Sequence, residues 1–244
     1  MKRSAASIVA QLIGAAQAAL NPHDMAGTLL AVTRSVVELG VADMVGITER
    51  TRSEEFRTTA PTEDAVVQAD HLQYRLNQGP CIQAIHDDAV LASNHVAADP
   101  RWSLWGPQAE SSLGIRAVIS AHLYTDKGSI GALNMYNREI QDYTSDDLEM
   151  ARVFGSYMSV LLAQYRNEQH LWTAVDARHR IGLAQGILMH KYGIDEGTAF
   201  GLLRRLSQDQ NVKLHLIADQ VIRTRTVPNT PLDGPGGLLT QPSA

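Results

Sequence analysis

The sequence predicts an α+β protein: a largely antiparallel sheet flanked by helices, then a long linking helix and an all-α module of three helices. Residues 115–125 and 129–137 have the pattern of paired strands, and the Asp-Lys-Gly sequence between them is a turn signal for an antiparallel hairpin. Helical patterns lie on both sides of the strand region, and residues 144–192 contain no proline and few strand signals. Strands grouped between helices favour the α+β class.

The composition is that of a globular chain with a sizeable core. Of 244 residues, 44% are apolar, which is enough for one large domain or two modest ones. The net charge of −5 argues against a protein that covers nucleic acid with its whole surface. Residues 170–227 nevertheless hold eight Lys and Arg against five Asp and Glu. A basic module on an acidic body points to an acidic partner.

The single cysteine, Cys81, excludes an intramolecular disulfide and a cysteine-based zinc site, and it fits a reducing compartment. Residues 1–20 combine basic residues, an apolar run and an Ala-Gln-Ala sequence, as a signal peptide does. Because Gln11 and Gln17 interrupt the run and apolar residues recur at helical spacing, we predict an amphipathic packing helix there. No stretch is long and apolar enough to span a membrane, so we expect a cytoplasmic protein with no membrane partner.

The elements of the first part follow from periodicity, caps and breakers. Asp24 is the expected N-cap of a helix over 21–40, which Gly40 ends. The following elements are expected to be strands at 42–49 and 56–60, helices at 64–76 and 81–87, a strand at 89–97, and a loop leading into a helix over 99–114. The expected domains are an N-terminal helix (1–21), a domain built on the sheet (22–165), a C-terminal module (166–227) and a Pro- and Gly-rich disordered tail (228–244).

One long helix is expected from Thr144 or Ser145 to about Tyr192, with an interruption near Gln169 left open. Its apolar residues fall near a three-four spacing, which suits pairing with a second copy of the chain. These residues are Met158, Leu161, Leu162, Tyr165, Trp172 and Val175. The alternative is that the helix packs only on its own domain.

Two short helices complete the C-terminal module. Asp195 is the expected cap of the first, whose buried stripe is Ala199, Leu202, Leu203 and Leu206. The second follows a Gln-Asp-Gln-Asn turn and presents one apolar face, formed by Leu214, Ile217, Ala218, Val221 and Ile222.

Gly182 and Gly186 lie one turn apart inside the long helix, where each glycine costs roughly 1 kcal/mol relative to alanine. Without side chains at these positions, another backbone can come close. We expect tight packing against a neighbouring helix; the alternative is that the missing side chains let RNA approach.

The segments RIGLAQGILM and GIDEGTAFGLLRRLSQDQNVKLHLIADQVI carry a family pattern at Ile181, Ala184, Gly186, Ile187, Leu188, Met189, Ala199, Phe200, Leu203, Ser207, Asn211, Leu214 and Ala218. With these residues the module resembles the ANTAR domain, the RNA-binding module of bacterial transcription antiterminators. Many members have Lys where this chain has Gln185, which removes one candidate phosphate contact.

The segments LQYRLNQGPCIQAI, DPRWSLWGPQA, LGIRAVISAHLY and IGALNMYN resemble the GAF domains that precede ANTAR modules in actinobacterial proteins. The resemblance implies a GAF sensor domain over 22–165 and an RNA-binding transcriptional antiterminator. It implies a homodimer with one module on each of two paired hairpins of a nascent transcript, so that a terminator hairpin does not form. The RNA polymerase elongation complex is then affected only indirectly. No enzyme activity and no cofactor are expected, although the GAF domain could take an unknown small-molecule ligand.

RNA binding requires cations for phosphates and groups that bond or stack on unpaired bases. The candidate RNA-binding residues are Arg178, Arg180, Gln185, Gly186, His190, Lys191, Arg204, Arg205 and Lys213, with His215 and Arg223 as further cationic residues outside the apolar stripes. Arg204 and Arg205 are expected to flank the buried stripe of their helix from opposite sides, so that both are at least partly exposed.

The sheet domain offers weaker signals. Cys81 follows Gly-Pro at an expected helix start, where a thiol pKa can fall, so redox sensing is an alternative to a buried structural cysteine. The four residues Cys81, His86, His95 and His122 match no recognised metal spacing, and no metal site is expected. The cyclic-nucleotide pattern Asn-Lys-Phe-Asp-Glu is absent, and two tryptophans, Trp102 and Trp105, are expected in the core.

Three other functions compete with antitermination. The last two helices superficially resemble a DNA-binding helix-turn-helix, although the turn lacks the expected glycine. Free methionine sulfoxide reductases are GAF folds, but they depend on several cysteines, and one cysteine cannot cycle through an internal disulfide. The third is a dimeric ligand sensor that binds no nucleic acid.

Overall fold

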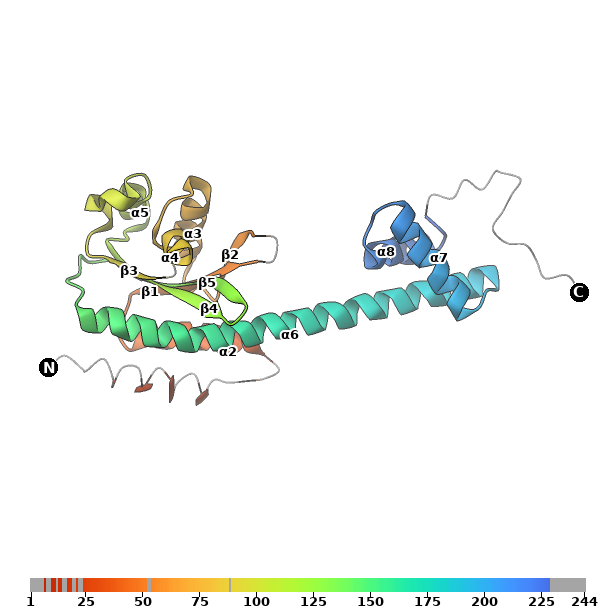
Figure 1. The fold of residues 1–244 in the computed structure, drawn as a ribbon, viewed down its shortest axis with the longest axis horizontal. Coiled ribbons are helices and arrows are strands. Elements are labelled where there is room, and N and C mark those ends of the chain that lie inside the picture. Colours follow the sequence, from red (N-terminus) through yellow and green to blue (C-terminus); the bar gives the residue numbers. More distant parts are fainter. Residues whose placement is uncertain are drawn as a thin grey trace, which may run out of the picture. The chain divides into compact units, whose positions relative to one another are not determined.

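The computed structural model describes residues 24–51, 54–87 and 89–228, together with eight isolated positions between residues 7 and 21. The predicted helix over 1–21 lies outside the described residues except at these eight positions, and the predicted disordered tail lies outside them except at residue 228. The chain divides into two compact units, Met1–Glu168 and Gln169–Ala244, drawn in Figure 1. In the part that the structure describes, none of the helices has the length and apolar content needed to cross a bilayer.

The first unit is built on a five-stranded antiparallel sheet with the strand order β2-β1-β5-β4-β3. The strands are β1 (Met44–Arg50), β2 (Phe56–Thr59), β3 (Val90–Ser93), β4 (Ala117–Thr125) and β5 (Gly128–Asn137). The predicted hairpin is the β4–β5 pair, in which Val118 lies opposite Tyr136 and Ala121 opposite Leu133. The α+β prediction is therefore confirmed, with the hairpin at the centre of the sheet.

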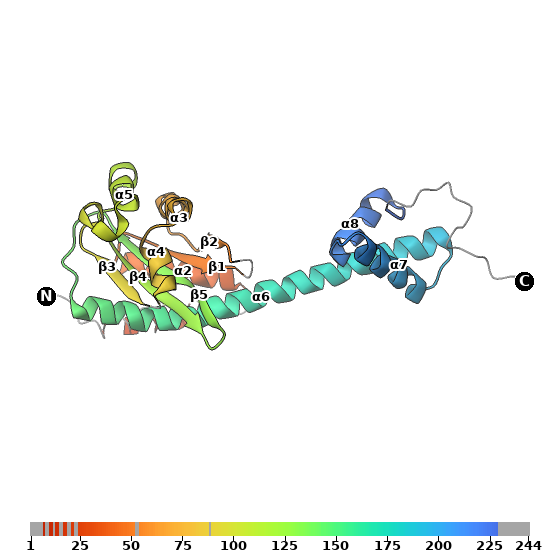
Figure 2. The same cartoon turned by 45° about the horizontal axis from the view of Figure 1, so that its top comes forward.

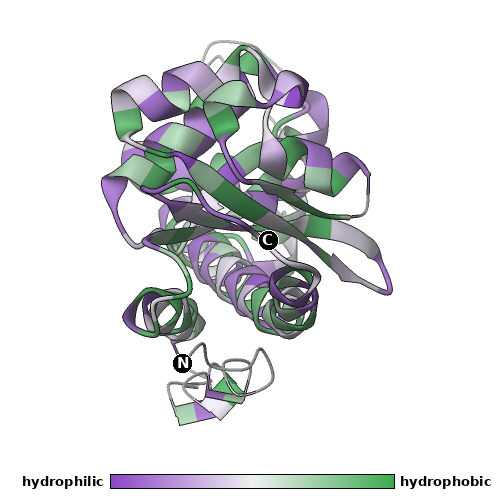
Figure 3. Cartoon of the chain, turned by 90° about the vertical axis from the view of Figure 1, so that its left-hand side faces the viewer, coloured by the Kyte–Doolittle hydropathy of each residue, from purple (hydrophilic) through white to green (hydrophobic). Residues whose placement is uncertain are grey.

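Helices cover both faces of this sheet, as Figures 1 and 2 show. One face carries α2 (Met25–Glu38) and the first part of α6 (Ser145–Tyr192); the other carries α3 (Asp64–Leu76), α4 (Pro80–His86) and α5 (Trp105–Leu113). Figure 3 looks along this layered arrangement and shows apolar strands between the helices. Because helices cover both faces, successive residues over most of β4 and β5 are buried on both sides of the sheet. Most of them are apolar, with Ser120 and Asn134 as buried polar exceptions, and Tyr124 near the end of β4 is exposed.

One predicted strand needs correction, and the extent of one predicted helix is settled. The strand expected over 89–97 ends at Ser93, because the amide of Val96 donates to the carbonyl of Arg116 (2.8 Å) and the chain turns into a short 3₁₀ helix, Val96–Ala98. The long helix α6 is continuous through Gln169, where an interruption was left open. The predicted cap of α2 is confirmed: the Asp24 carboxylate accepts from the amide of Gly27 at 2.8 Å.

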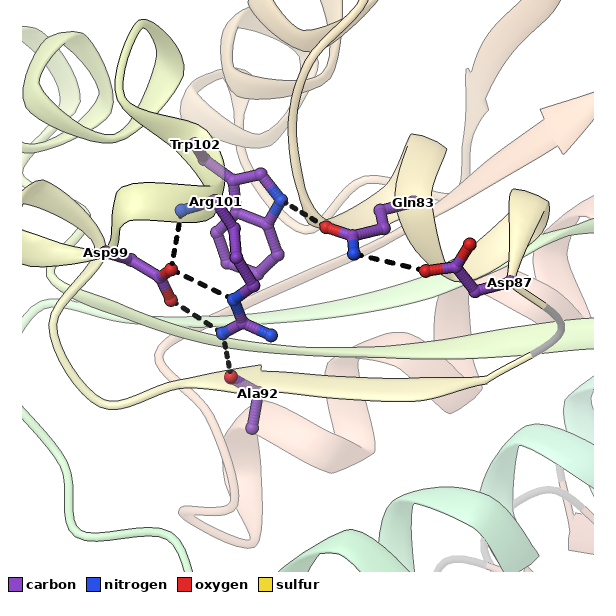
Figure 4. A network of polar contacts seen from close by, with 6 residues as sticks. All are labelled: Gln83, Asp87, Ala92, Asp99, Arg101 and Trp102. Atoms are coloured by element: carbon purple, nitrogen blue, oxygen red, sulfur yellow. Dashed lines mark hydrogen bonds and ion pairs between the residues drawn. The ribbon is translucent and has the colours of Figure 1, made fainter.

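A polar network ties α4 to the turn after β3 (Figure 4). The Arg101 guanidinium donates to the Asp99 carboxylate and to the carbonyl of Ala92 (both 2.6 Å), and it lies over the ring of Trp102. The indole of Trp102 donates in turn to Gln83 of α4 (2.8 Å). Trp102 and Trp105 are buried in an edge-to-face pair, which confirms that they belong to the core.

A second network surrounds a buried carboxylate, that of Asp70 on α3. It accepts from the hydroxyl of Tyr136 (2.7 Å) and the amide of Asn134 (3.2 Å), both on β5. Its other oxygen accepts from Thr58 (2.9 Å), Thr48 (3.3 Å) and Tyr74 (3.5 Å). Every donor described here is neutral, so burial dominates and raises the pKa of Asp70 from 3.8 to about 6, against the opposing effect of these hydrogen bonds.

The raised pKa of Asp70 makes the stability of this unit fall as the pH rises. The neutral form of Asp70 favours the folded state fully below pH 3.8, and this contribution of about 3 kcal/mol is lost as the pH rises through about 6. We expect Asp70→Asn to become more stable relative to wild type over that pH range, because the neutral amide can bond the same hydroxyls. Urea unfolding followed by the fluorescence of the buried tryptophans measures the difference.

Asp99 supplies the control for this experiment. Burial opposes its ionisation, but bonds from Arg101 and Ser93 outweigh burial and lower its pKa. The substitution Asp99→Asn should therefore lose stability relative to wild type as the pH rises. If the stability difference between Asp70→Asn and wild type did not change with pH, burial would not raise the pKa of Asp70.

Candidate functional site

The second unit is a three-helix module with a small aliphatic core. It consists of the C-terminal part of α6, α7 (Glu196–Asp209) and α8 (Leu214–Thr224). Its fully buried side chains are Ala184, Leu188, Ala199, Leu203, Ile217, Ala218 and Val221. Asp195 caps α7 as predicted, since its carboxylate accepts from the amide of Thr198 at 2.7 Å. These contacts fix the side that each helix turns toward its neighbours.

The two interior glycines of α6 face away from this core. A Cβ atom added at Gly182 or Gly186 would meet nothing within 4 Å, and both residues are exposed. The expectation of tight helix–helix packing at these positions is therefore wrong for the described chain. Ala184 and Leu188 take the buried side of α6, and residues two positions away from a buried residue lie on the far side of a helix.

The side chain of Gln185 lies where α6 approaches α7. Its amide donates to the carbonyl of Glu196 at 3.4 Å, in the first turn of α7. Along α7, Glu196 is followed at four-residue steps by Phe200 and Arg204, which occupy the same edge of the helix. This edge of α7 therefore starts beside the segment of α6 that contains Gly186.

Two of the predicted RNA-binding cations are bonded within the module. Arg180 donates to both oxygens of Asp219 on α8 (3.0 and 2.9 Å) and pairs with Asp176 (2.8 Å), and these partners raise its pKa. The ammonium group of Lys191 donates to the carbonyl of Arg225 at 2.8 Å. Gln185 lies five positions after Arg180, which places the two about 140° apart around α6. These bonds hold α8 and the residues that follow it against α6.

The other predicted cations are exposed, but they do not form one cluster. Arg178, His190 and Lys213 lie on α6 and at the cap of α8. Arg204 and Arg205 are both exposed, as expected, and Arg205 pairs with Asp209 on its own helix at 3.7 Å. Arg205 lies nine positions after Glu196 and therefore on the opposite side of α7, whereas Arg204 lies on the Glu196 edge.

Phe200 also lies on this edge, although it is not among the RNA-binding residues predicted from the sequence. It is 41% exposed. Its position among the family-matching residues was visible in the sequence, but nothing in the sequence separated an exposed aromatic from a buried one. Only the register of Ala199 and Leu203 in the core turns the Phe200 side chain toward solvent.

In the first unit, Cys81 is fully buried. Burial, and then the nearby Asp70 carboxylate, raise the pKa of its thiol well above the ordinary value, so the suggested lowering of this pKa at a helix start is wrong. His95 bonds Glu110 and His122 bonds Ser129, and His86 is exposed. Among the described residues, no three His, Cys, Asp or Glu side chains are grouped so that they could hold a metal ion.

The same unit has an open cavity of about 480 Å³ beside the β4–β5 hairpin. Its walls include His122, Tyr124, Ser129, Arg152 and Ser156, so the hairpin and α6 both line it. Arg152 pairs with Glu149 at 3.3 Å.

The comparisons with known proteins match both units. The family model of the ANTAR domain matches residues 169–222, and that of the GAF domain matches residues 22–163, more than half of the chain. A search among curated proteins finds no match.

Solved structures share the fold of the first unit. The GAF domain of a phosphoenolpyruvate-protein phosphotransferase from Coxiella burnetii has a TM-score of 0.54 at 13% identity, covering 68% of this chain and 97% of that one. The corresponding Acinetobacter domain has 0.52 at 10%, covering 70% and 99%. Free methionine-R-sulfoxide reductase from Neisseria meningitidis, in complex with its substrate, has 0.52 at 17%, covering 68% and 95%. At these identities the likeness concerns the fold alone.

The open surroundings of Gly182 and Gly186 predict the effect of adding a methyl group. We expect Gly182→Ala and Gly186→Ala to leave the module as stable as wild type or to stabilise it by up to about 1 kcal/mol, because alanine is the better helix former. Hydrogen exchange of the amides of α7 and α8 measures this.

Gly106→Ala is the contrasting variant in the first unit, since its Cβ would overlap the carbonyl oxygen of Val96. It should increase exchange in the sheet unit. If Gly186→Ala also increased exchange in the module, the glycine would be packed after all.

Proposed function

Because the chain belongs to the GAF domain family and carries an ANTAR domain after it, we propose that it binds paired hairpins in nascent RNA and keeps a terminator hairpin from forming. An ANTAR domain indicates RNA-binding antitermination regulation, and a GAF domain indicates an input domain. The two matched domains are a sensor and a regulatory module. We propose that the input acts through α6, which belongs to both units.

The observation that carries this proposal is a surface of the module that we name the α6–α7 face. It consists of Gly182, Gln185 and Gly186 on α6 and Phe200 and Arg204 on α7. The glycines admit a bulky backbone, Gln185 offers an amide, and Arg204 offers a guanidinium without an ion pair among the described residues. RNA loops present phosphates and splayed bases, which require this combination of groups.

A second copy of the chain is the proposed partner of α6. All residues from 169 to 176 are exposed, although three of them are large and apolar: Leu171 is 69%, Trp172 62% and Val175 57% exposed. By contrast, Met158 and Leu161 of the predicted seam are buried in their own unit. The dimer contact we propose is thus confined to the later part of the seam, and it would bring two modules to two hairpins.

DNA binding is the second candidate, and one feature favours it. The turn between α7 and α8 has Asn211 in the left-handed conformation (φ 51°), so asparagine fills the role that glycine has in a helix-turn-helix turn. The two functions differ in the nucleic acid they require.

Fluorescence anisotropy of the full chain with a two-hairpin RNA and with a DNA duplex of equal length separates them. We expect the protein to bind the two-hairpin RNA more tightly, and to lose affinity when one hairpin is deleted. Equal or tighter binding to the duplex would overturn the antitermination proposal in favour of DNA.

The salt dependence of RNA binding tests the α6–α7 face directly. Each phosphate contact releases counterions, so Arg204→Ala should lower the slope of log K against log salt by about one. The matched control is Arg205→Ala, which removes the same charge from the neighbouring residue on the other side of α7. If wild type and Arg204→Ala had equal slopes, or if both variants lost the same slope, the assignment of the phosphate contact to Arg204 would be wrong.

The dimer contact has its own test. Val175→Glu places a charge in the exposed apolar segment and should shift the protein toward the monomer in sedimentation equilibrium, because the carboxylate would be buried without a partner. The control, Leu216→Glu, changes a side chain of α8 that is also exposed (45%) but lies outside α6. A dimer that survives Val175→Glu would contradict pairing along this segment.

A further inference from the structure

Phe200 is the exposed aromatic side chain of the α6–α7 face. The module has two other aromatic residues among those described. Tyr192 is partly buried and its hydroxyl bonds Thr226 (3.0 Å), while Trp172 lies on the exposed segment proposed for pairing. Because Ala199 and Leu203 are buried on either side of it in the sequence, the helical period leaves Phe200 outside the core. Its exposure follows from the register of α7.

The surroundings of Phe200 leave room for a planar group. Its neighbours at i−3 and i+1 are Gly197 and Gly201. A Cβ at Gly201 would meet nothing within 4 Å, and at Gly197 it would meet only an oxygen of Asp195 at 3.3 Å. No side chain on these two positions can therefore cover the ring.

The charge around Phe200 is suited to a nucleotide. Arg204 follows one turn later on the same edge of α7, and Gln185 of α6 reaches the carbonyl of Glu196 one turn earlier. On the Arg204 side of Phe200, a base can lie on the ring while the guanidinium, which has no ion pair among the described residues, holds the adjoining phosphate. On the other side lie the Glu196 carboxylate and the Gln185 amide. An apolar partner protein would gain nothing from this guanidinium.

We infer that Phe200 forms a stacking site for one unpaired base of an RNA loop, with Arg204 on the phosphate next to it. The inference rests on the proposed function and adds a base-binding residue to it. Stacking on an aromatic face is tolerant of base identity, so this site selects unpaired over paired bases and does not read the sequence. It makes Phe200 a determinant of hairpin-loop recognition.

The test uses the full chain and a two-hairpin RNA that carries the fluorescent base 2-aminopurine in turn at each loop position. In wild type, one loop position should be quenched on binding. We expect Phe200→Ala to weaken binding about 5- to 150-fold, as removal of one stacked base does, and to abolish that quenching. The salt slope should remain that of wild type, because no phosphate contact is lost.

Three further variants separate stacking from mere packing. Phe200→Trp should keep affinity and quenching, whereas Phe200→Leu, which keeps an apolar side chain in the same place, should behave like Phe200→Ala. Leu216→Ala, an exposed apolar residue of α8, should bind as wild type does. Hydrogen exchange of α7 shows whether each variant remains folded.

The outcomes distinguish this inference from the proposed function. If wild type binds the RNA and Arg204→Ala changes its salt slope, but Phe200→Leu binds as tightly as wild type, the stacking site is overturned and RNA binding stands. If Phe200→Ala instead converts the dimer to monomer, Phe200 belongs to a contact between copies and the inference also fails. If wild type does not bind the RNA, the proposed function itself has failed.

Discussion

The burial of Ala184 and Leu188 against α7 and α8 is the contact on which the surface of the module depends. It fixes the rotation of α6, and with it the exposure of Gly182 and Gly186. Each glycine costs helix stability, roughly 1 kcal/mol relative to alanine, and in the described chain no close contact offsets that cost. The proposed contact with the backbone of an RNA would account for glycine at these two positions.

The same core also separates the cations of the module by role. Arg180 bonds Asp219 of α8, and Lys191 bonds the carbonyl of Arg225 directly after α8, so both cations help to hold the three helical segments together. Such help matters in a unit whose buried residues are few and small. Arg204 lies on the other side, beside Phe200, and Arg205 is turned away from both. The excess of basic residues is therefore divided between structure and surface, and a count of charges overstates what is available to a ligand.

The GAF unit shows a different use of buried polar groups. Its sheet is covered on both faces, so Asp70 and Cys81 are far from water. Burial makes the thiol a poor nucleophile and the carboxylate a weaker acid, and five neutral donors keep the carboxylate in place. On the other face of the sheet, α6 buries Phe154 and Met158, while its residues 169–176 are all exposed. One helix thus contributes both a core surface and an exposed apolar segment.

Local signals in the sequence predicted most of the elements: Asp24 and Asp195 cap their helices, the Asp-Lys-Gly turn joins β4 to β5, and the periodicity of residues 145–192 gives one helix. They did not predict that the strand expected over 89–97 ends at Ser93. The family resemblances came from side chains that the core and the turns require. Nothing local could decide that Gly186 faces outward, that Arg180 bonds Asp219, that Cys81 is buried or that Phe200 is exposed. Exposure and pairing depend on which distant segment covers a residue, and that is settled only when the helices pack and each buried side chain fixes the rotation of its own helix.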